Sequence, residues 1–143
     1  MLVGEYRHTV DAKKRLAIPA KFRAELGRKG VITRGLDQCL FVFSAEEWEK
    51  LAQKLGSLPL SAADARSFAR VMLSGAMEVE FDQLGRILLP DYLKEYAGIG
   101  KNVVVTGVFN RLEIWEESRW TGYKDKAEKN VGDLAEKLGG LGI

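Results

Sequence analysis

The stretch that decides the fold is Asp11-Ala12-Lys13-Lys14-Arg15-Leu16-Ala17-Ile18-Pro19, because the chain contains a second copy of it. That copy is Asp82-Gln83-Leu84-Gly85-Arg86-Ile87-Leu88-Leu89-Pro90. The Asp, the Arg and the Pro keep the same spacing in both copies, with an apolar residue after each Arg and before each Pro. Aspartate favours turns, and proline cannot donate a ladder hydrogen bond. We therefore predict two tight charged turns, each followed by a short buried strand that ends at a proline.

The repeat extends beyond these turns. Turn, core and helix positions match in the same order along the chain, and the pairs include Gly4 with Gly75, Gly27 with Gly98, Leu40 with Leu112 and Trp48 with Trp120. Self-similarity of this kind indicates two copies of one supersecondary unit. We expect the organisation to be a first repeat at 1–56, a linker helix at 57–74, a second repeat at 75–126 and a helical tail at 127–143.

Each repeat predicts the same elements. Short strands flank the turn, a short helix follows the proline, and a second pair of strands leads into a longer helix. A unit of about fifty residues buries too little apolar surface to be stable alone, and it leaves strand edges unpaired. We therefore expect an α+β, β-rich fold in which the two repeats interleave as a pseudo-two-fold barrel with flanking helices. Neighbouring subunits are expected to cover further edges.

The composition is that of a globular protein, with 46% hydrophobic and 29% charged residues among 143. Apolar runs such as 40–43 are too short to cross a bilayer, and the N-terminus lacks the layout of a signal peptide. Cys39 is the one cysteine, so no internal disulfide can form, which fits a reducing compartment. We expect a soluble cytoplasmic protein with no membrane partner.

The charge is unevenly distributed along the chain. Residues 1–35 carry nine Lys or Arg against three Asp or Glu, whereas residues 36–143 carry thirteen against seventeen. A basic front on a mildly acidic body suggests an anionic partner that meets the first third of the chain. The alternative is that the excess charge is scattered over a solvated surface.

The sequence offers little for catalysis. His8 and Cys39 are each the only residue of their type, which argues against a metal cluster or a catalytic triad. No glycine-rich phosphate loop occurs, so we expect no cofactor, no metal and no small-molecule substrate. One enzymatic alternative is that Asp11 and Asp82 share a proton as a carboxylate pair. Each, however, lies four residues before an arginine, and an ion pair there lowers the carboxyl pKa.

The first turn is better suited to binding DNA. Asp11 can fix the turn by accepting backbone N–H bonds and can hold Arg15 in a bidentate pair. An arginine oriented in this way fits the O6/N7 edge of guanine in the major groove. Lys13 and Lys14 add positive charge for phosphates. The competing interpretation is that the Asp–Arg pair has only a structural role and stabilises its own hairpin.

The second turn repeats the Asp82–Arg86 pair, but Leu84-Gly85 stands where the first turn has two lysines. For Arg86, DNA contact and a purely structural role are therefore more evenly balanced. We predict the first turn to be the main DNA-reading turn, with the second completing the symmetric body.

These motifs resemble those of the MraZ family of bacterial regulators from the division and cell-wall gene cluster. The resemblance rests on the two Asp-x-x-x-Arg turns and on the run from Ile18 to Arg23, and it extends from Met1 to about Lys126. It implies swapped-hairpin, AbrB-like modules in a ring of subunits that binds tandem promoter repeats, and thus a nucleoid-associated transcription regulator. The motif role carries over to these positions: Asp11, Arg15, Asp82 and Arg86, with Lys13 and Lys14 by adjacency.

The first turn departs from the family pattern, which commonly has glycine where this chain has Lys14. A non-glycine residue is strained there if its φ is positive, so either the two turns differ in type or Lys14 is tolerated for its charge.

Magnitudes favour a multivalent assembly. One turn with three basic side chains neutralises ~2–3 phosphates, which gives only weak, salt-sensitive binding. Several tethered turns on repeated DNA boxes raise avidity by ~10²–10⁴. We therefore expect a homo-oligomer. The alternative function is a protein-interaction module, an antitoxin-like scaffold whose acidic helices dock a protein without contacting DNA.

Overall fold

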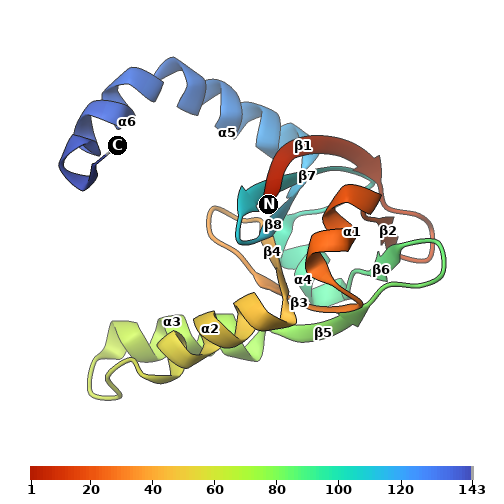
Figure 1. Ribbon diagram of the computed structural model, residues 1–143, viewed down its shortest axis with the longest axis horizontal. Helices are drawn as coiled ribbons and strands as arrows, with labels where there is room; N and C mark the ends of the chain where they lie inside the picture. Colours follow the sequence, from red (N-terminus) through yellow and green to blue (C-terminus); the bar gives the residue numbers. More distant parts are fainter. Residues whose placement is uncertain (143) are drawn as a thin grey trace.

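The computed structural model describes residues 1–142 and shows an α+β body from which two helical extensions project (Figure 1). The elements of the first half are β1 (Leu2–Thr9), β2 (Arg15–Ala17), α1 (Ala20–Leu26), β3 (Lys29–Arg34), β4 (Leu40–Ser44), α2 (Ala45–Gly56) and α3 (Ala63–Ser74). Those of the second half are β5 (Met77–Glu80), β6 (Arg86–Leu88), α4 (Asp91–Ala97), β7 (Asn102–Phe109), β8 (Leu112–Glu116), α5 (Glu117–Lys129), α6 (Val131–Lys137) and the 3₁₀ turn η1 (Gly139–Leu141).

The main sheet has six antiparallel strands in the order β1-β7-β8-β4-β3-β5. Under the sequence repeat, β1 corresponds to β5, β7 to β3 and β8 to β4, so this order reads the same from either edge. The outer strand of each half pairs with the other half, β1 with β7 and β5 with β3. The expected interleaving of the repeats is therefore present in the strand order.

The α+β fold is as predicted, but residues 1–142 do not form the expected barrel as a closed sheet. The six-stranded sheet is open, with β1 and β5 at its edges, and β2 and β6 form a separate two-stranded sheet. The physical reason is the length of β2 and β6, which have three residues each and end before Pro19 and Pro90. A proline supplies no ladder donor, so these strands stop before they can join the main sheet.

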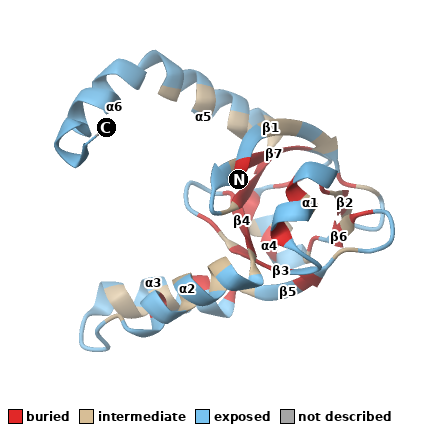
Figure 2. Ribbon diagram, in the orientation of Figure 1, coloured by how far each residue is buried: buried red, intermediate tan, exposed pale blue. Residues whose placement is uncertain are grey.

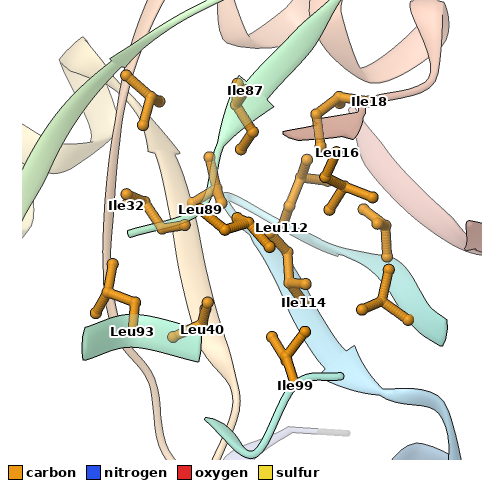
Figure 3. Packing of buried hydrophobic residues seen from close by; sticks show 14 of the residues in the cluster. Leu16, Ile18, Ile32, Leu40, Ile87, Leu89, Leu93, Ile99, Leu112 and Ile114 are labelled. Carbon is orange, nitrogen blue, oxygen red and sulfur yellow. The ribbon is translucent and has the colours of Figure 1, made fainter. Parts of the chain in front are cut away.

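One core lies between the two sheets and the short helices α1 and α4. Leu16 of β2 and Ile87 of β6 face each other in register and are almost fully buried. Figure 3 shows them packed against side chains from both halves, among which are Ile32, Leu40, Leu89, Leu93, Leu112 and Ile114. Because both repeats contribute to the same core, neither half buries its apolar face alone.

A second apolar cluster lies on the opposite face of the sheet, where α2 and α3 pack. It is formed by Phe41 and Phe43 of β4 with Leu55 of α2 and Met72 of α3. Ser44 caps α2 by accepting the backbone N–H of Glu47. Alternation along β4 explains the two cores, because Val42 points into the first and its neighbours into the second.

The two helical extensions are largely exposed, whereas buried residues concentrate in the body (Figure 2). The pair α2–α3 forms one extension, and α5 followed by α6 forms the other (Figure 1). Every residue from 131 to 142 is exposed. Among the described residues, no helix is both long and apolar enough to cross a membrane.

Candidate nucleic-acid interface

The first turn is built around the Asp11 carboxylate. Its Oδ1 accepts the backbone N–H groups of Lys13 and Arg15, both at 2.9 Å. Its Oδ2 accepts the Nε–H of Arg15 at 3.0 Å. The Lys14 backbone N–H donates to the Asp11 carbonyl at 3.0 Å, which closes the turn. One aspartate thus fixes both the loop backbone and the arginine that follows it.

The second turn has the same construction. Asp82 Oδ1 accepts the N–H groups of Leu84 and Arg86 at 2.9 Å each, and Oδ2 accepts Arg86 Nε–H at 2.8 Å. The Gly85 N–H donates to the Asp82 carbonyl at 3.0 Å. The repeated sequence therefore gives two turns with matching hydrogen bonds.

The fold brings the two turns together at one end of the body, away from both helical extensions (Figure 1). Strands β2 and β6 pair antiparallel, with Arg15 opposite Leu88 and Ala17 opposite Arg86. Arg86 Nη1 lies 3.8 Å from Asp11 Oδ2, so the second arginine also faces the first aspartate. The four motif residues predicted from the sequence consequently form one charged cluster.

The predicted bidentate Asp–Arg pairing is wrong in detail. Each aspartate bonds the guanidinium through one oxygen and Nε, because its other oxygen is occupied by two backbone amides. Among residues 1–142, the terminal nitrogens of Arg15 have no hydrogen-bond partner. Arg15 and Arg86 keep 32% and 25% of their surface exposed, so both guanidinium groups remain accessible to a ligand.

The question of turn type is resolved by Lys14. Its φ is 62°, close to the 74° of Gly85, so both turns use the left-handed conformation at this position. The Lys14 ammonium lies 2.6 Å from Asp91 Oδ1 at the start of α4. Lys14 is therefore held by the other repeat, whereas the Lys13 side chain forms no ion pair within the described residues. Of the two predicted lysines, Lys13 is the freer cation.

Sequence reasoning missed the environment of Gly85. The guanidinium of Arg23, from α1, occupies the space that a side chain at Gly85 would fill, with its central carbon 2.5 Å from the position of an added Cβ. Arg23 Nε donates to the Ile18 carbonyl at 3.0 Å. No periodicity could have found this contact, because it depends on the pairing of β2 with β6.

The electrostatics of the turns disfavour the carboxylate-pair alternative. The backbone N–H of Arg15 is the main cause that lowers the pKa of Asp11, with the Arg15 side chain adding to it. The N–H of Arg86 lowers the pKa of Asp82 in the same way. Both carboxylates are thus held ionised, which is unsuited to sharing a proton near neutral pH.

Other candidate chemistry is sparse in residues 1–142. Cys39 is fully buried, and burial raises the pKa of its thiol, so it behaves as a small apolar residue. Within the part of the chain that is described, no group of three or more metal-ligating side chains comes together.

Fold and site together define a class: a duplicated α+β protein whose two halves pair their outer strands with each other and present two matching Asp–Arg turns. A family profile described as "MraZ protein, putative antitoxin-like" matches residues 1–71 and again residues 72–139. The chain is 52% identical to the protein named Transcriptional regulator MraZ from Halothermothrix orenii, across 100% of both chains. Proteins of the same name from Acetivibrio thermocellus and Moorella thermoacetica are 50% identical across 100% of both chains and 55% identical across 96% of both.

These matches confirm the resemblance inferred from the turns. The chain belongs to the MraZ family.

Proposed function

We propose that the chain is a cytoplasmic, nucleoid-associated transcription regulator that binds tandem promoter repeats in double-stranded DNA through its two Asp–Arg turns. The name shared by its relatives supports regulation of transcription. The observation that carries the DNA contact is the charged cluster at one end of the body, where two matching turns hold the partly exposed Arg15 and Arg86 through their Nε atoms.

The two arginines suit the reading of bases. A guanidinium fixed through Nε keeps its terminal N–H groups for a guanine edge, and a two-stranded ribbon fits the major groove. Lys13 supplies the phosphate contact beside Arg15. Asp11 and Asp82 act indirectly by fixing the turns. The first turn, with Lys13 at its tip, is the primary reader.

The same proposal extends to the organisation of the chain. Residues 1–56 and 75–126 act as two AbrB-like, swapped-hairpin repeats, joined by 57–74 and followed by the tail 127–143. The pairing of β1 with β7 and of β5 with β3 supports this exchange of strands between repeats.

We further propose that subunits assemble into a ring through the C-terminal arm, which consists of α5, α6 and η1. The arm carries an exposed apolar stripe formed by Val131, Leu134, Leu138 and Leu141. A groove of about 330 Å³ lies between the α2–α3 pair and the body, with Phe41, Phe43, Phe68 and Met72 among its lining residues.

A second copy of this chain is the occupant that the groove fits. Three cations, Lys50, Lys54 and Arg111, line it against one acid, Glu47, whereas α6 presents Asp133 and Glu136 beside its stripe. An arm-to-groove contact joins different surfaces of two copies, so its repetition gives a ring when the rotation closes.

The test of DNA binding is fluorescence anisotropy with a duplex from the promoter of the chain's own operon and a scrambled duplex of equal length. We expect the wild type to prefer the promoter, and the pair Arg15→Ala with Arg86→Ala to lose that preference while keeping its oligomeric mass. Equal binding to both duplexes by the wild type would contradict sequence-specific reading. Capture of a protein partner that survives loss of Lys13, Lys14 and Arg15 would favour the interaction-module alternative instead.

The test of the ring is mass by light scattering. Leu134→Asp places a charge in the apolar stripe, and we expect it to reduce the oligomer to smaller species with unchanged circular dichroism. Lys129→Asp, an exposed change on the preceding helix, is the control. An unchanged mass for Leu134→Asp would rule out the arm as the interface.

A further inference from the structure

The second turn has a cation that its own sequence does not provide. Leu84 and Gly85 are uncharged, yet the Arg23 guanidinium lies directly over Gly85. An added Cβ at Gly85 would lie 2.5 Å from the central carbon, 2.6 Å from Nε and 2.8 Å from Nη1 of Arg23. Since real Cβ atoms essentially never approach so closely, the absent side chain of Gly85 is what lets the guanidinium rest on the turn.

Arg23 is oriented by one hydrogen bond to its own half of the chain. Its Nε donates to the carbonyl of Ile18 at 3.0 Å, and Ile18 in turn donates its N–H to the Gly85 carbonyl at 3.0 Å. The guanidinium, the end of β2 and the second turn are therefore linked in a short hydrogen-bonded series. This bond engages one nitrogen of Arg23 and leaves both terminal nitrogens available.

The charge of Arg23 is uncompensated within residues 1–142, since no carboxylate lies within ion-pair distance of it. The first turn is arranged differently, because the Lys14 ammonium is paired with Asp91 at 2.6 Å. Lys14 and Gly85 are equivalent positions of the repeat. Each turn thus meets a residue from the opposite repeat, an acid at the first turn and a base at the second.

We propose that Arg23 binds a phosphate at the second turn. It has the role there that Lys13 has at the tip of the first turn. This inference rests on the proposed DNA-binding function. A guanidinium with two free terminal nitrogens, fixed beside the Asp82–Arg86 pair, suits bidentate contact with a backbone phosphate. Because phosphate contacts carry no sequence information, Arg23 contributes affinity and register, not base choice.

The test compares Arg23→Gln with Lys21→Gln by anisotropy titration over a series of salt concentrations. Both variants remove one positive charge from α1, but Lys21 is exposed and, within the described residues, its side chain forms no hydrogen bond or ion pair with either turn. We expect Arg23→Gln to bind promoter and scrambled DNA ~5- to 10-fold more weakly and to lower the salt slope by about one unit for each engaged subunit. The ratio of the two affinities should stay unchanged. Arg23→Lys should recover most of the slope.

A purely structural role for Arg23 predicts a different outcome, namely a fall in Tm with an unchanged salt slope. Gly85→Ala separates the two roles further, because its methyl group occupies the place of the guanidinium. We expect Gly85→Ala to reproduce the slope change of Arg23→Gln, and the double variant to add little to either. Lys14, at φ 62°, shows that the equivalent position of the first turn accommodates a side chain.

The outcomes distinguish this inference from the proposed function. If the wild type does not bind DNA, or Arg15→Ala leaves binding intact, the proposed function fails and the inference fails with it. If the wild type binds and Arg15→Ala abolishes promoter preference, but Arg23→Gln behaves as Lys21→Gln, only the role of Arg23 is overturned.

Discussion

The two turns share one backbone and differ in the side chains around it. Their aspartate-centred hydrogen bonds agree to within 0.2 Å, and the residue before each arginine has φ 62° in one and 74° in the other. The first turn carries two lysines, one of them paired with Asp91. The second has Leu84 at its tip and Arg23 lying over Gly85. Duplication has thus kept the scaffold symmetric while its charges became distributed differently.

The largest effect we expect falls equally on both turns. Leu16 and Ile87 are opposite each other in the β2–β6 pair and are 0% and 1% exposed. Truncating either to alanine leaves a cavity under both turns, so Leu16→Ala and Ile87→Ala should each lower the free energy of unfolding by ~2–5 kcal/mol. Chemical denaturation measures this. If only one of the two substitutions strongly lowered the free energy of unfolding, the two turns would not be structurally equivalent.

The next largest effect, on promoter binding, should differ between the two turns. We expect Arg15→Ala to weaken promoter binding by ~100-fold or more, because a lost guanine contact of ~1–3 kcal/mol is multiplied over several tethered turns. Arg86→Ala should weaken it by roughly 10-fold, as the loss of one subsidiary contact. Anisotropy titration at fixed salt measures both. Equal losses would mean that the turns read DNA as equivalents.

The aspartates should give a smaller, pH-dependent effect. Both have folded pKa values below the ordinary value, so their stabilisation is present above pH ~3.9 and is lost as the pH falls through the lower folded pKa. At pH 7 we expect Asp11→Asn and Asp82→Asn to lower Tm by about 2–5 °C. Asp11→Asn should have the larger effect, because Asp11 also faces Arg86 at 3.8 Å.

Thermal melts at several pH values test this. The difference in Tm between wild type and variant should narrow as the pH falls below the ordinary aspartate pKa, because the wild-type carboxylates become protonated as the pH passes through their lowered folded pKa. A difference that is constant with pH would show that the carboxylate charge is not what stabilises the turns.

The smallest effect concerns the turn tips, where Lys13 and Leu84 occupy equivalent positions. Lys13→Leu should weaken binding several-fold on any sequence and lower the salt slope by about one unit for each engaged subunit, since it removes one phosphate contact from each. Leu84→Lys should have the opposite effect. The double variant exchanges the tips and should restore the wild-type slope. Failure of Leu84→Lys to raise the slope would mean that the second tip lies away from the phosphates.

Much of this arrangement could be predicted from the repeat. The Asp-x-x-x-Arg-to-Pro spacing predicted both turns and the short strands after them, because these depend on local turn chemistry. The pairing of the outer strands across the two halves also followed, from the small core that one repeat could bury. The two sheets do not close into a barrel, because β2 and β6 are too short to join the main sheet. The sequence pattern could not show how short these strands are.

The partners of the site residues could not be predicted. Lys14 was predicted to add positive charge for phosphates, and the sequence did not show that its ammonium pairs with Asp91, which lies far along the sequence. The contact of Arg23 with Gly85 likewise joins opposite repeats. Such contacts are set by the register of β2 against β6, which periodicity within one strand does not reveal.

The pairing of β1 with β7 has a consequence for the synthesis of the protein. Leu2 is opposite Phe109, so the first strand must wait for the last third of the chain before its ladder can form. At a ribosomal rate of ~5–20 residues per second, the N-terminal half spends several seconds with an unpaired edge. The charged and polar residues Glu5, Arg7, His8 and Thr9 along β1 are then what keeps that nascent edge from pairing with a neighbouring chain.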